Sequence, residues 1–386
     1  MTIEDNANFN KIWNSIIMEA RQIKLVSVTQ WLQENKAKDI ILYGTGICGR
    51  SALSNLRSLG FNIVAFSDSN SSKWEKNIDG LKIIPPSSIS KMFNDPFIII
   101  CFNEHYKIEI PKTKILLNNF CCTRNIFYGD LRSVLDFQKL DNPLALCRAI
   151  LPNEEYKYKI SKVYSTLSDE VSRKTLIDVL LDRIRIFPQW ELPSYQMYFP
   201  EDIFQLSDNE VFFDCGAYNG DTLQAFLARR PNFMKYFAFE PDSKNAIKFN
   251  QNLKNYPTEQ QNKILLKEKA ISDKCGNVFF EETGEIGGSR ITESGNSVSC
   301  TTLDFEFNSD VKPTYVKMDI EGGEKQAILG GLQGIKNHKP SLAVSVYHYP
   351  NDLWEIPTMI HDNFPFYNIF LRAYLAGDIV CYAIPK

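Results

Sequence analysis

The chain alternates short apolar runs with polar segments in which apolar residues recur at helical spacing. Apolar runs that predict strands occur along its length, at 39–43, 62–66, 81–84, 97–102, 114–117, 211–213, 236–239, 315–318 and 341–347. Two more runs, at 366–371 and 379–384, are joined by a turn containing Gly377 and predict a hairpin. Strands that alternate with helical segments favour α/β folds with mostly parallel sheets.

Two longer segments carry apolar residues at helical spacing, one at 9–31 and the other at 171–184. A stretch rich in aromatic residues and proline follows at 189–200, where Trp190 and Tyr195 either line an acceptor pocket or pack between domains. We therefore expect four parts. They are an N-terminal helix (1–36), a Rossmann-like domain of nucleotide-binding type (37–135), a helical connector (136–200) and a second α/β domain (201–386).

Two successive strands of the second domain end on carboxylates. The run at 211–213 leads into Asp214 and a turn containing Gly216 and Gly220, and the next run ends at Glu240. Open α/β sheets bind ligands beyond the carboxyl ends of their strands. A dinucleotide site would have Gly-x-Gly-x-x-Gly, whereas an acidic turn repels a pyrophosphate and suits a cationic, amine-bearing ligand with an adenosine, as in S-adenosylmethionine. The simpler alternative is an ordinary strand-end turn with a helix cap.

The same pattern recurs later in the chain. Asp319 and Glu321 follow the run at 315–318, and His348 follows the run at 341–347. Because the carboxyl ends of parallel strands meet at one edge of a sheet, we expect these titratable groups to lie near the acidic turn.

From about residue 198 onward the sequence resembles the FkbM family of S-adenosylmethionine-dependent methyltransferases. The resemblance is carried by five ordered blocks, at 211–222, 239–241, 270–272, 317–331 and 347–357. It implies a class I methyltransferase fold, in which the last strand of a seven-stranded sheet runs antiparallel. It also implies methyl transfer to a hydroxyl of a sugar or of a sugar-containing precursor of a surface polysaccharide or secondary metabolite.

The resemblance also implies roles for individual residues. Glu240 would hold the ribose hydroxyls, the backbone near Ile271 and Ser272 would frame the adenine, and Asp319 would lie where cofactor and acceptor meet. The other expected cofactor-binding residues form the turn after the first strand, namely Asp214, Gly216, Ala217, Tyr218, Asn219, Gly220 and Thr222. The chain departs from the expected pattern at Arg372, where we expect a histidine near Tyr374, so its acceptor could differ.

An alcohol is a poor nucleophile until its proton can leave, so a general base is useful. His348 is the first candidate base and Asp319 the second, with Glu321 close by; alternatively, His348 caps the helix expected at 351–360. We expect no metal, because the four histidines and nine cysteines lack the spacings typical of metal sites.

The first domain carries its own glycine-rich turn. Gly44, Gly46 and Gly49 follow an apolar strand, and Asp68 ends the next strand, where a Rossmann unit has its ribose-binding acid. The turn either binds NAD or a nucleotide sugar, or it only connects a strand to a helix in a domain used for assembly or substrate presentation. This part resembles the Rossmann-type domains in front of some sugar-modifying enzymes.

Composition narrows the function classes. The net charge of −3 and the dispersed basic residues give no case for nucleic-acid binding, and the longest apolar run, at 97–102, is too short to span a membrane. We expect a cytoplasmic protein with reduced cysteines that acts on a small molecule or glycan. The sequence is compatible with a monomer and with a homo-oligomer. Two alternatives are a non-catalytic nucleotide-binding scaffold and an NAD-dependent sugar-nucleotide oxidoreductase or epimerase. The second would need a catalytic Tyr-x-x-x-Lys, and Tyr158 and Lys162 have this spacing only within the connector.

Overall fold

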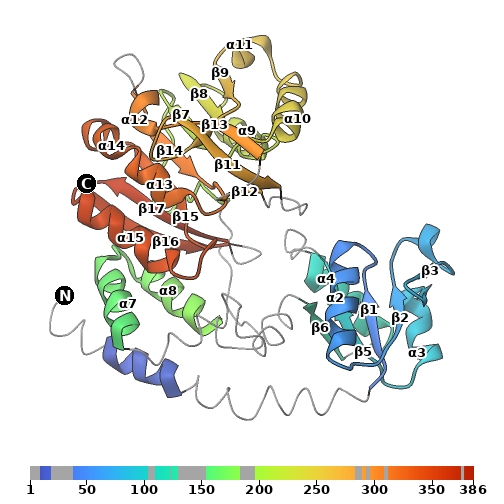
Figure 1. Ribbon diagram of the computed structural model, residues 1–386. Coiled ribbons are helices and arrows are strands. Elements are labelled where there is room, and N and C mark those ends of the chain that lie inside the picture. Colours follow the sequence, from blue (N-terminus) through green and yellow to red (C-terminus); the bar gives the residue numbers. More distant parts are fainter. Residues whose placement is uncertain are drawn as a thin grey trace. The chain divides into compact units, whose positions relative to one another are not determined.

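The computed structural model describes residues 9–18, 38–102, 109–122, 124–128, 154–182, 196–282, 289–292, 296–307, 312–374 and 378–386 (Figure 1). The chain divides into two compact units. The N-terminal unit takes residues 2–156 and 178–191, and the C-terminal unit takes residues 157–177 and 192–386. The segment expected to be a connector is thus shared between the two units.

The N-terminal unit is built on a six-stranded sheet with the order β3-β4-β2-β1-β5-β6, in which only the pairing of β3 with β4 is antiparallel. Its strands are β1 (Ile40–Tyr43), β2 (Ile63–Ser67), β3 (Asn77–Ile78), β4 (Leu81–Ile84), β5 (Phe97–Ile100) and β6 (Asn125–Phe127). Its helices are α2 (Ile47–Ser58), η1 (Ser71–Lys73), η2 (Pro86–Ser88), α3 (Ile89–Met92) and α4 (Glu109–Asn119). The parallel α/β fold predicted for this half is confirmed.

Both faces of this sheet are covered, which explains why its strands are continuously apolar. Ile40 and Leu42 of β1 pack into one core, and Ile41 and Tyr43 pack into a second core on the opposite face. Successive side chains of a strand point to opposite faces, so a strand buried on both sides needs apolar residues at every position.

One predicted strand of this unit is wrong. Residues 114–117 lie in helix α4, and the next strand is β6 instead. Ile115 is exposed and Leu117 is buried, as on a helix with one face against the sheet. A short apolar run fits a buried strand and an amphipathic helix equally well, so periodicity alone could not separate them.

Helices precede each unit's sheet. Residues 9–18 are helical, within the helix predicted at 9–31, and Phe9, Trp13 and Ile16 are buried on one side of it; residues 19–31 lie outside the described part of the chain. The helix predicted at 171–184 corresponds to α8 (Glu170–Asp182), which follows α7 (Glu154–Thr166).

The C-terminal unit contains a seven-stranded sheet with the order β16-β17-β15-β14-β7-β8-β9. Its strands are β7 (Val211–Cys215), β8 (Lys235–Phe239), β9 (Ile264–Lys267), β14 (Tyr315–Met318), β15 (Ser341–Ser345), β16 (Tyr367–Ala373) and β17 (Ile379–Pro385). The last strand, β17, runs antiparallel to both of its neighbours, whereas the pairings among β15, β14, β7, β8 and β9 are parallel. The predicted class I methyltransferase fold, with its C-terminal hairpin, is confirmed.

Helices and a small second sheet complete this unit. The helices are α9 (Asp221–Arg229), α10 (Ser243–Leu253), α11 (Thr258–Gln261), α12 (Leu303–Glu306), α13 (Glu324–Leu329), α14 (Leu332–His338) and α15 (Asp352–Asn363), the last of which lies beside β16 and β17 (Figure 1). The second sheet, of order β10-β13-β11-β12, comprises β10 (Ala270–Ile271), β11 (Gly276–Glu282), β12 (Ser289–Thr292) and β13 (Asn296–Thr301).

Aromatic side chains dominate the core of the large sheet. Phe212 lies between Tyr236 and Tyr315, with ring centroids 4.9 Å away on each side. Such a stack fixes neighbouring strands β8, β7 and β14, whose carboxyl ends carry the candidate site.

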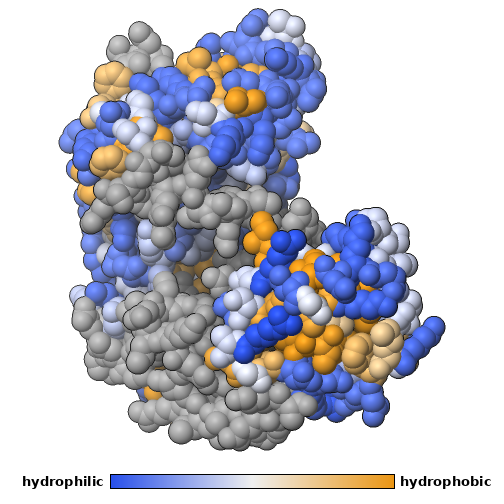
Figure 2. Space-filling model, turned by 45° about the vertical axis from the view of Figure 1, so that its right-hand side comes forward, coloured by the Kyte–Doolittle hydropathy of each residue, from blue (hydrophilic) through white to orange (hydrophobic). Residues whose placement is uncertain are grey.

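Apolar side chains also reach the surface. Figure 2 shows them beside hydrophilic residues, and in the N-terminal unit Ile47, Met92 and Ile115 are among those exposed. Single exposed apolar side chains are normal on protein surfaces. Among the described residues, no helix has the length and apolar character needed to cross a membrane.

Candidate functional site

The turn after β7 packs directly against the turn after β14. Gly216 has a φ of 86°, and a Cβ at this position would lie 1.8 Å from the carbonyl oxygen of Asp319. The backbone N–H of Asp319 in turn donates to the carbonyl of Cys215 over 3.0 Å. Only glycine allows both the backbone conformation and the approach, so the two acidic turns are in direct backbone contact.

Asp214 supports this turn from beneath. It is fully buried, with Oδ1 3.0 Å from Nζ of Lys317 and Oδ2 accepting a hydrogen bond from the Tyr236 hydroxyl. Burial raises the pKa of Asp214, and Lys317 opposes that rise. Nζ of Lys317 also donates to the carbonyl of Gly216 over 2.6 Å, so the pair holds the turn in place. Because Asp214 has no exposed surface, it acts on a ligand only through this backbone.

Glu240 closes the other side of the turn. Its Oε2 accepts from the N–H of Tyr218 over 2.8 Å, and its Oε1 accepts from the N–H of Asp242 over 2.9 Å. The carboxyl group is buried, which raises its pKa, while the two N–H groups favour the charged form. Each oxygen keeps a further lone pair, which is what gripping a vicinal diol requires.

The remaining predicted cofactor residues surround these two features. Ala217 is buried, Thr222 lies in the first turn of α9, and the Asn219 carbonyl accepts a hydrogen bond from the side chain of Asn252. Ile271 and Ser272 are buried at the end of β10. The structure therefore brings the turn residues and Glu240 together, and places Ile271 and Ser272 at the carboxyl end of β10 in the smaller sheet.

Two tyrosine hydroxyls hold Asp319. Tyr347 donates to Oδ1 over 2.9 Å and Tyr198 donates to Oδ2 over 2.7 Å. Although burial disfavours its charged form, Lys317, His348 and the hydroxyls of Tyr198 and Ser345 lower the pKa of Asp319. Its carboxylate is therefore charged and already occupied by donors, which makes it a weak proton acceptor.

His348 lies among three carboxylates. Its Nδ1 is 3.1 Å from Oε1 of Glu324, and its Nε2 is 3.4 Å from Oδ1 of Asp319 and 3.5 Å from Oε2 of Glu321. Burial opposes protonation, but Glu324, Asp319 and Glu321 outweigh it and raise the pKa of His348 to about 10. The imidazole is then a cation at neutral pH, which does not fit the base role predicted for it.

The helix-capping alternative for His348 also differs from the structure. Helix α15 begins after Asn351, and its first turn is tied by Asp352, whose Oδ2 accepts from the N–H of Tyr349 over 3.0 Å. His348 instead faces Glu324, the first residue of α13.

Glu321 is the most exposed carboxylate of this group, with 37% of its side chain accessible. Burial raises its pKa to about 7, and the neighbouring His348 opposes that rise. Its backbone has a φ of 57°, followed by Gly322 at 97°, where a Cβ would lie 2.3 Å from the Tyr349 ring. A non-glycine residue in the left-handed region is uncommon and is typical of functional turns.

Sequence reasoning missed three residues of this cluster. Glu324 stands at the end of the predicted acidic turn, Tyr347 directly precedes His348, and Tyr198 belongs to the aromatic stretch that was interpreted as part of the connector. The only sequence signal for Tyr198 is its position shortly before the strand at 211–213. Nothing in its spacing relates it to Asp319. Trp190 and Tyr195 lie outside the described residues.

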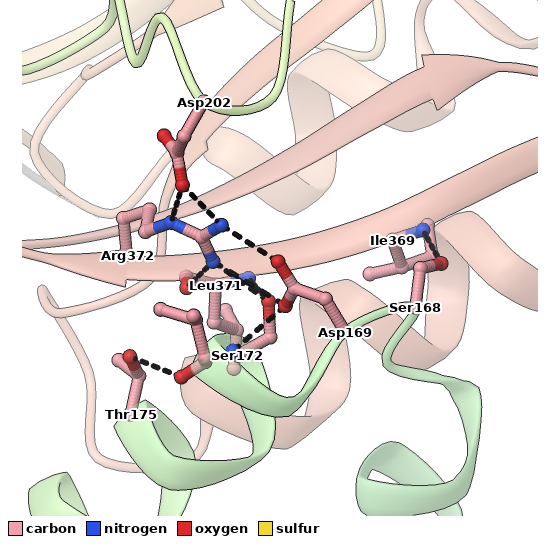
Figure 3. A network of polar contacts seen from close by, with 9 residues as sticks. Ser168, Asp169, Ser172, Thr175, Asp202, Ile369, Leu371 and Arg372 are labelled. Atoms are coloured by element: carbon pink, nitrogen blue, oxygen red, sulfur yellow. Dashed lines mark hydrogen bonds and ion pairs between the residues drawn. The ribbon is translucent and has the colours of Figure 1, made fainter.

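Arg372, where the chain departs from the family pattern, is buried and pairs with carboxylates that do not belong to the acidic turns. Its guanidinium bonds Asp202 through Nε (3.0 Å) and Nη2 (2.6 Å), and Nη2 also reaches Asp169 (2.7 Å) (Figure 3). Nη1 donates to Ser172 over 2.9 Å, and Oγ of Ser172 accepts from the N–H of Leu371. Arg372 therefore joins β16 to the start of α8 and to the segment after Tyr198, which is a structural role.

The glycine-rich turn of the N-terminal unit has its acid already engaged. Oδ2 of Asp68 accepts from Oγ1 of Thr45 (2.6 Å) and pairs with Nζ of Lys73 (2.8 Å), while Oδ1 accepts from the N–H of Asn70 (2.9 Å). Burial disfavours its charge, but Lys73, Thr45 and Asn70 lower the pKa of Asp68.

The three glycines of this turn differ in their surroundings. A Cβ on Gly44 would lie 2.6 Å from the Cys101 carbonyl and one on Gly49 would lie 2.1 Å from the Gly44 carbonyl, whereas Gly46 faces open space. Two of the three glycines are therefore explained by close packing against neighbouring backbone. Taken together with Asp68, this arrangement gives no support to NAD or a nucleotide sugar as a ligand of this unit.

Comparison with known proteins relates the two units to different families. Residues 214–376 match the model described as Methyltransferase FkbM domain, and residues 36–118 match the model described as C2185-like, N-terminal. The C-terminal unit carries an FkbM methyltransferase domain. The predicted resemblance to the FkbM methyltransferases is confirmed for this part of the chain, and it supports a methyltransferase activity.

A solved structure extends the likeness beyond this domain. The crystal structure of Methyltransferase FkbM from Methylobacillus flagellatus KT has a TM-score of 0.69 and 20% sequence identity, and the alignment covers 96% of this chain and 99% of that chain. At this identity the match shows a shared fold. An rRNA methylase from Streptococcus thermophilus gives a TM-score of 0.31 at 15% identity, over 47% of this chain and 89% of that chain. No curated protein matches the chain.

Proposed function

We propose that this FkbM-type methyltransferase uses S-adenosylmethionine to methylate a hydroxyl of a sugar or of a sugar-containing precursor. The observation that supports the cofactor is Glu240, a buried carboxylate at the end of β8 whose oxygens are oriented by the N–H groups of Tyr218 and Asp242. Beside it lies the turn that Gly216 allows to approach β14. This is the site that class I sheets use for an adenosine-bearing ligand.

The residues present fit that cofactor. Glu240 would hold the ribose hydroxyls, and the turn from Gly216 to Gly220 would border the methionine part, with its backbone fixed from below by Asp214 and Lys317. When bound, S-adenosylmethionine would supply a methyl group carried on a sulfonium; the acceptor oxygen would bond to the methyl carbon as the carbon–sulfur bond breaks, and a neutral thioether would leave.

The cluster of Asp319, Glu321 and His348 is proposed to receive the acceptor. These side chains follow β14 and β15, next to the cofactor turn, and the two carboxylates provide negative charge for the step in which a hydroxyl loses its proton. Glu321 is the most exposed member and has no tyrosine donor assigned to it, so it is the carboxylate best placed to contact an acceptor from solvent. Positioning and proton removal are the two contributions that such a displacement needs.

Calorimetric titration with S-adenosylhomocysteine tests the cofactor assignment. We expect Glu240→Gln to weaken binding at least about tenfold, because the amide cannot accept from both backbone N–H groups and the diol as a carboxylate does. Glu259→Gln is a matched control, since Glu259 is an exposed glutamate in the same unit. No binding by the wild-type protein would reject the proposal.

The acceptor class needs a separate assay. Radiolabelled methyl transfer from S-adenosylmethionine would be measured against nucleotide sugars, free glycans and matched acceptors carrying an amine in place of the hydroxyl. Radiolabelled methyl that is recovered on the sugar, in a linkage that base does not cleave, supports O-methylation. Transfer only to the amine-bearing acceptors would contradict it, even if S-adenosylhomocysteine binds.

A further inference from the structure

Side chains around the turn after β14 place potential metal ligands close together. Asp319, Glu324 and His348 each offer one ligand atom, and these atoms lie within 4.8 Å of one another. Glu321 adds a carboxylate oxygen 3.5 Å from Nε2 of His348, on the more exposed side. A set of one imidazole and several carboxylates suits first-row divalent ions that accept both nitrogen and oxygen ligands.

Two of these side chains are buried without a well-aligned hydrogen bond. Neither ring nitrogen of His348 has one, although carboxylate oxygens lie 3.1–3.5 Å away, and the side chain is only 8% exposed. Oε2 of Glu324, on a fully buried residue, also has none. Buried polar atoms in native proteins are nearly always satisfied. Only a neutral imidazole coordinates a metal, so an ion bound here replaces the proton that the neighbouring carboxylates otherwise hold on His348.

The carboxylates are held in the manner of metal ligands. Tyr198 and Tyr347 each donate to one oxygen of Asp319. The N–H of Ile320 donates to Oε1 of Glu324 over 2.8 Å, which leaves Oε2 free. Ligating carboxylates are typically oriented by such outer hydrogen bonds, which fix the ligand before the ion arrives.

Lysines of the same region are committed to other carboxylates. Lys317 pairs with Asp214, and Lys325 pairs with Asp352 and Glu355. Three carboxylates, those of Asp319, Glu321 and Glu324, therefore converge on one histidine. Such a concentration of negative charge is favourable for a divalent cation.

We propose that Asp319, Glu324 and His348, with Glu321 at the exposed side, bind one divalent first-row transition-metal ion. The ion holds the acceptor's hydroxyl oxygen and makes it more acidic, as bound metals do for water. This second role rests on the proposed methyl transfer, whereas binding of the ion does not.

The test is a titration of the full-length protein with Mn²⁺ after dialysis against a chelator, followed by the electron paramagnetic resonance signal of free Mn²⁺ and by calorimetry. We expect one ion per chain. His348→Ala should abolish binding, and the isosteric Glu324→Gln should weaken it about 10–100-fold. His361→Ala is the matched control, because His361 lies next to Asp362 on the exposed side of α15.

The same samples are titrated with S-adenosylhomocysteine, and their circular dichroism spectra report whether each variant is folded. Absence of Mn²⁺, Co²⁺ and Zn²⁺ binding, or equal binding in wild type and both variants, overturns the metal site. If S-adenosylhomocysteine binds and no metal does, the inference fails while the proposed cofactor stands. Metal binding that His348→Ala removes, without S-adenosylhomocysteine binding, supports the site and rejects the proposed cofactor instead.

Discussion

The hydroxyl of Tyr198 donates to Oδ2 of Asp319 over 2.7 Å, although the two residues are 121 positions apart in the sequence. The backbone of Tyr198 is held as well, because its N–H donates to the hydroxyl of Tyr382 and its carbonyl accepts from the hydroxyl of Tyr315. Residue 198 precedes the matched family domain, which begins at residue 214. A segment outside that domain therefore orients a central carboxylate of the candidate site.

Tyr198→Phe should lower turnover without weakening cofactor binding. The substitution keeps the buried ring but removes one donor to a charged carboxylate, an interaction of about 1.5–3 kcal/mol. We expect kcat to fall about tenfold or more, since each 1.36 kcal/mol lost in the transition state is a factor of ten. S-adenosylhomocysteine affinity should change little. Tyr158→Phe, on the exposed face of α7, is the control. Unchanged kcat in Tyr198→Phe would show that this hydroxyl does not matter for the reaction.

Arg372→Met should destabilise the C-terminal unit. Removing the guanidinium leaves Asp169 and Asp202 without their buried partner, and breaking a buried ion pair in this way costs about 3–5 kcal/mol. Arg230→Met is a matched control, because Arg230 forms a longer ion pair with Asp208 in which both side chains are at least one-third exposed. Exposed pairs contribute about 0–1 kcal/mol. Urea unfolding followed by near-ultraviolet circular dichroism compares the two, and equal midpoints would contradict the structural role of Arg372.

The sheets and the acidic turns were predictable because their signals are local. A buried parallel strand must be apolar at every position, and a carboxylate directly after it must lie at the ligand-binding edge, as Asp319 and Glu240 do. Asp214 shows the limit of this rule. It is the last but one residue of β7 and points into the core toward Lys317, and position in the strand alone does not reveal that partner.

What could not be predicted depends on distant contacts. The sequence shows Arg372 as a departure from a family pattern and suggests a changed acceptor, whereas the structure pairs it with Asp169 and Asp202, at least 170 positions away. The carboxylates around His348 likewise come from helix α13 and from the turn after β14, so neither periodicity nor spacing could predict the charge state of His348. The strand predicted at 114–117 was wrong for the opposite reason, because the local sequence signal was itself ambiguous.

Asp68→Asn should destabilise the N-terminal unit in a pH-dependent way. The folded state lowers the pKa of Asp68, so its contribution is fully present above the unfolded value of about 3.8 and is lost as pH falls through the lower folded value. The difference between wild type and variant should therefore be largest near neutral pH and shrink below about pH 4. Hydrogen exchange of peptides covering β1 and β2 measures it. Asp95→Asn, in an exposed pair with Arg124, serves as control, and a pH-independent difference would contradict the charge-based explanation.

Gly322→Ala should disturb the acidic turn for two separable reasons. The left-handed backbone costs an alanine about 1–2 kcal/mol, and its Cβ would also lie 2.3 Å from the ring of Tyr349. Adding Tyr349→Ala removes the clash but not the backbone strain, so the double variant should recover only part of the lost stability and turnover. Gly46→Ala is the matched glycine control. Its φ is −73° and its Cβ would face open space, so the cost should stay within about 1 kcal/mol. Thermal unfolding and kcat are compared among wild type, Gly322→Ala, the double variant and Gly46→Ala. Full recovery in the double variant would show that the turn at Glu321 carries no strain of its own.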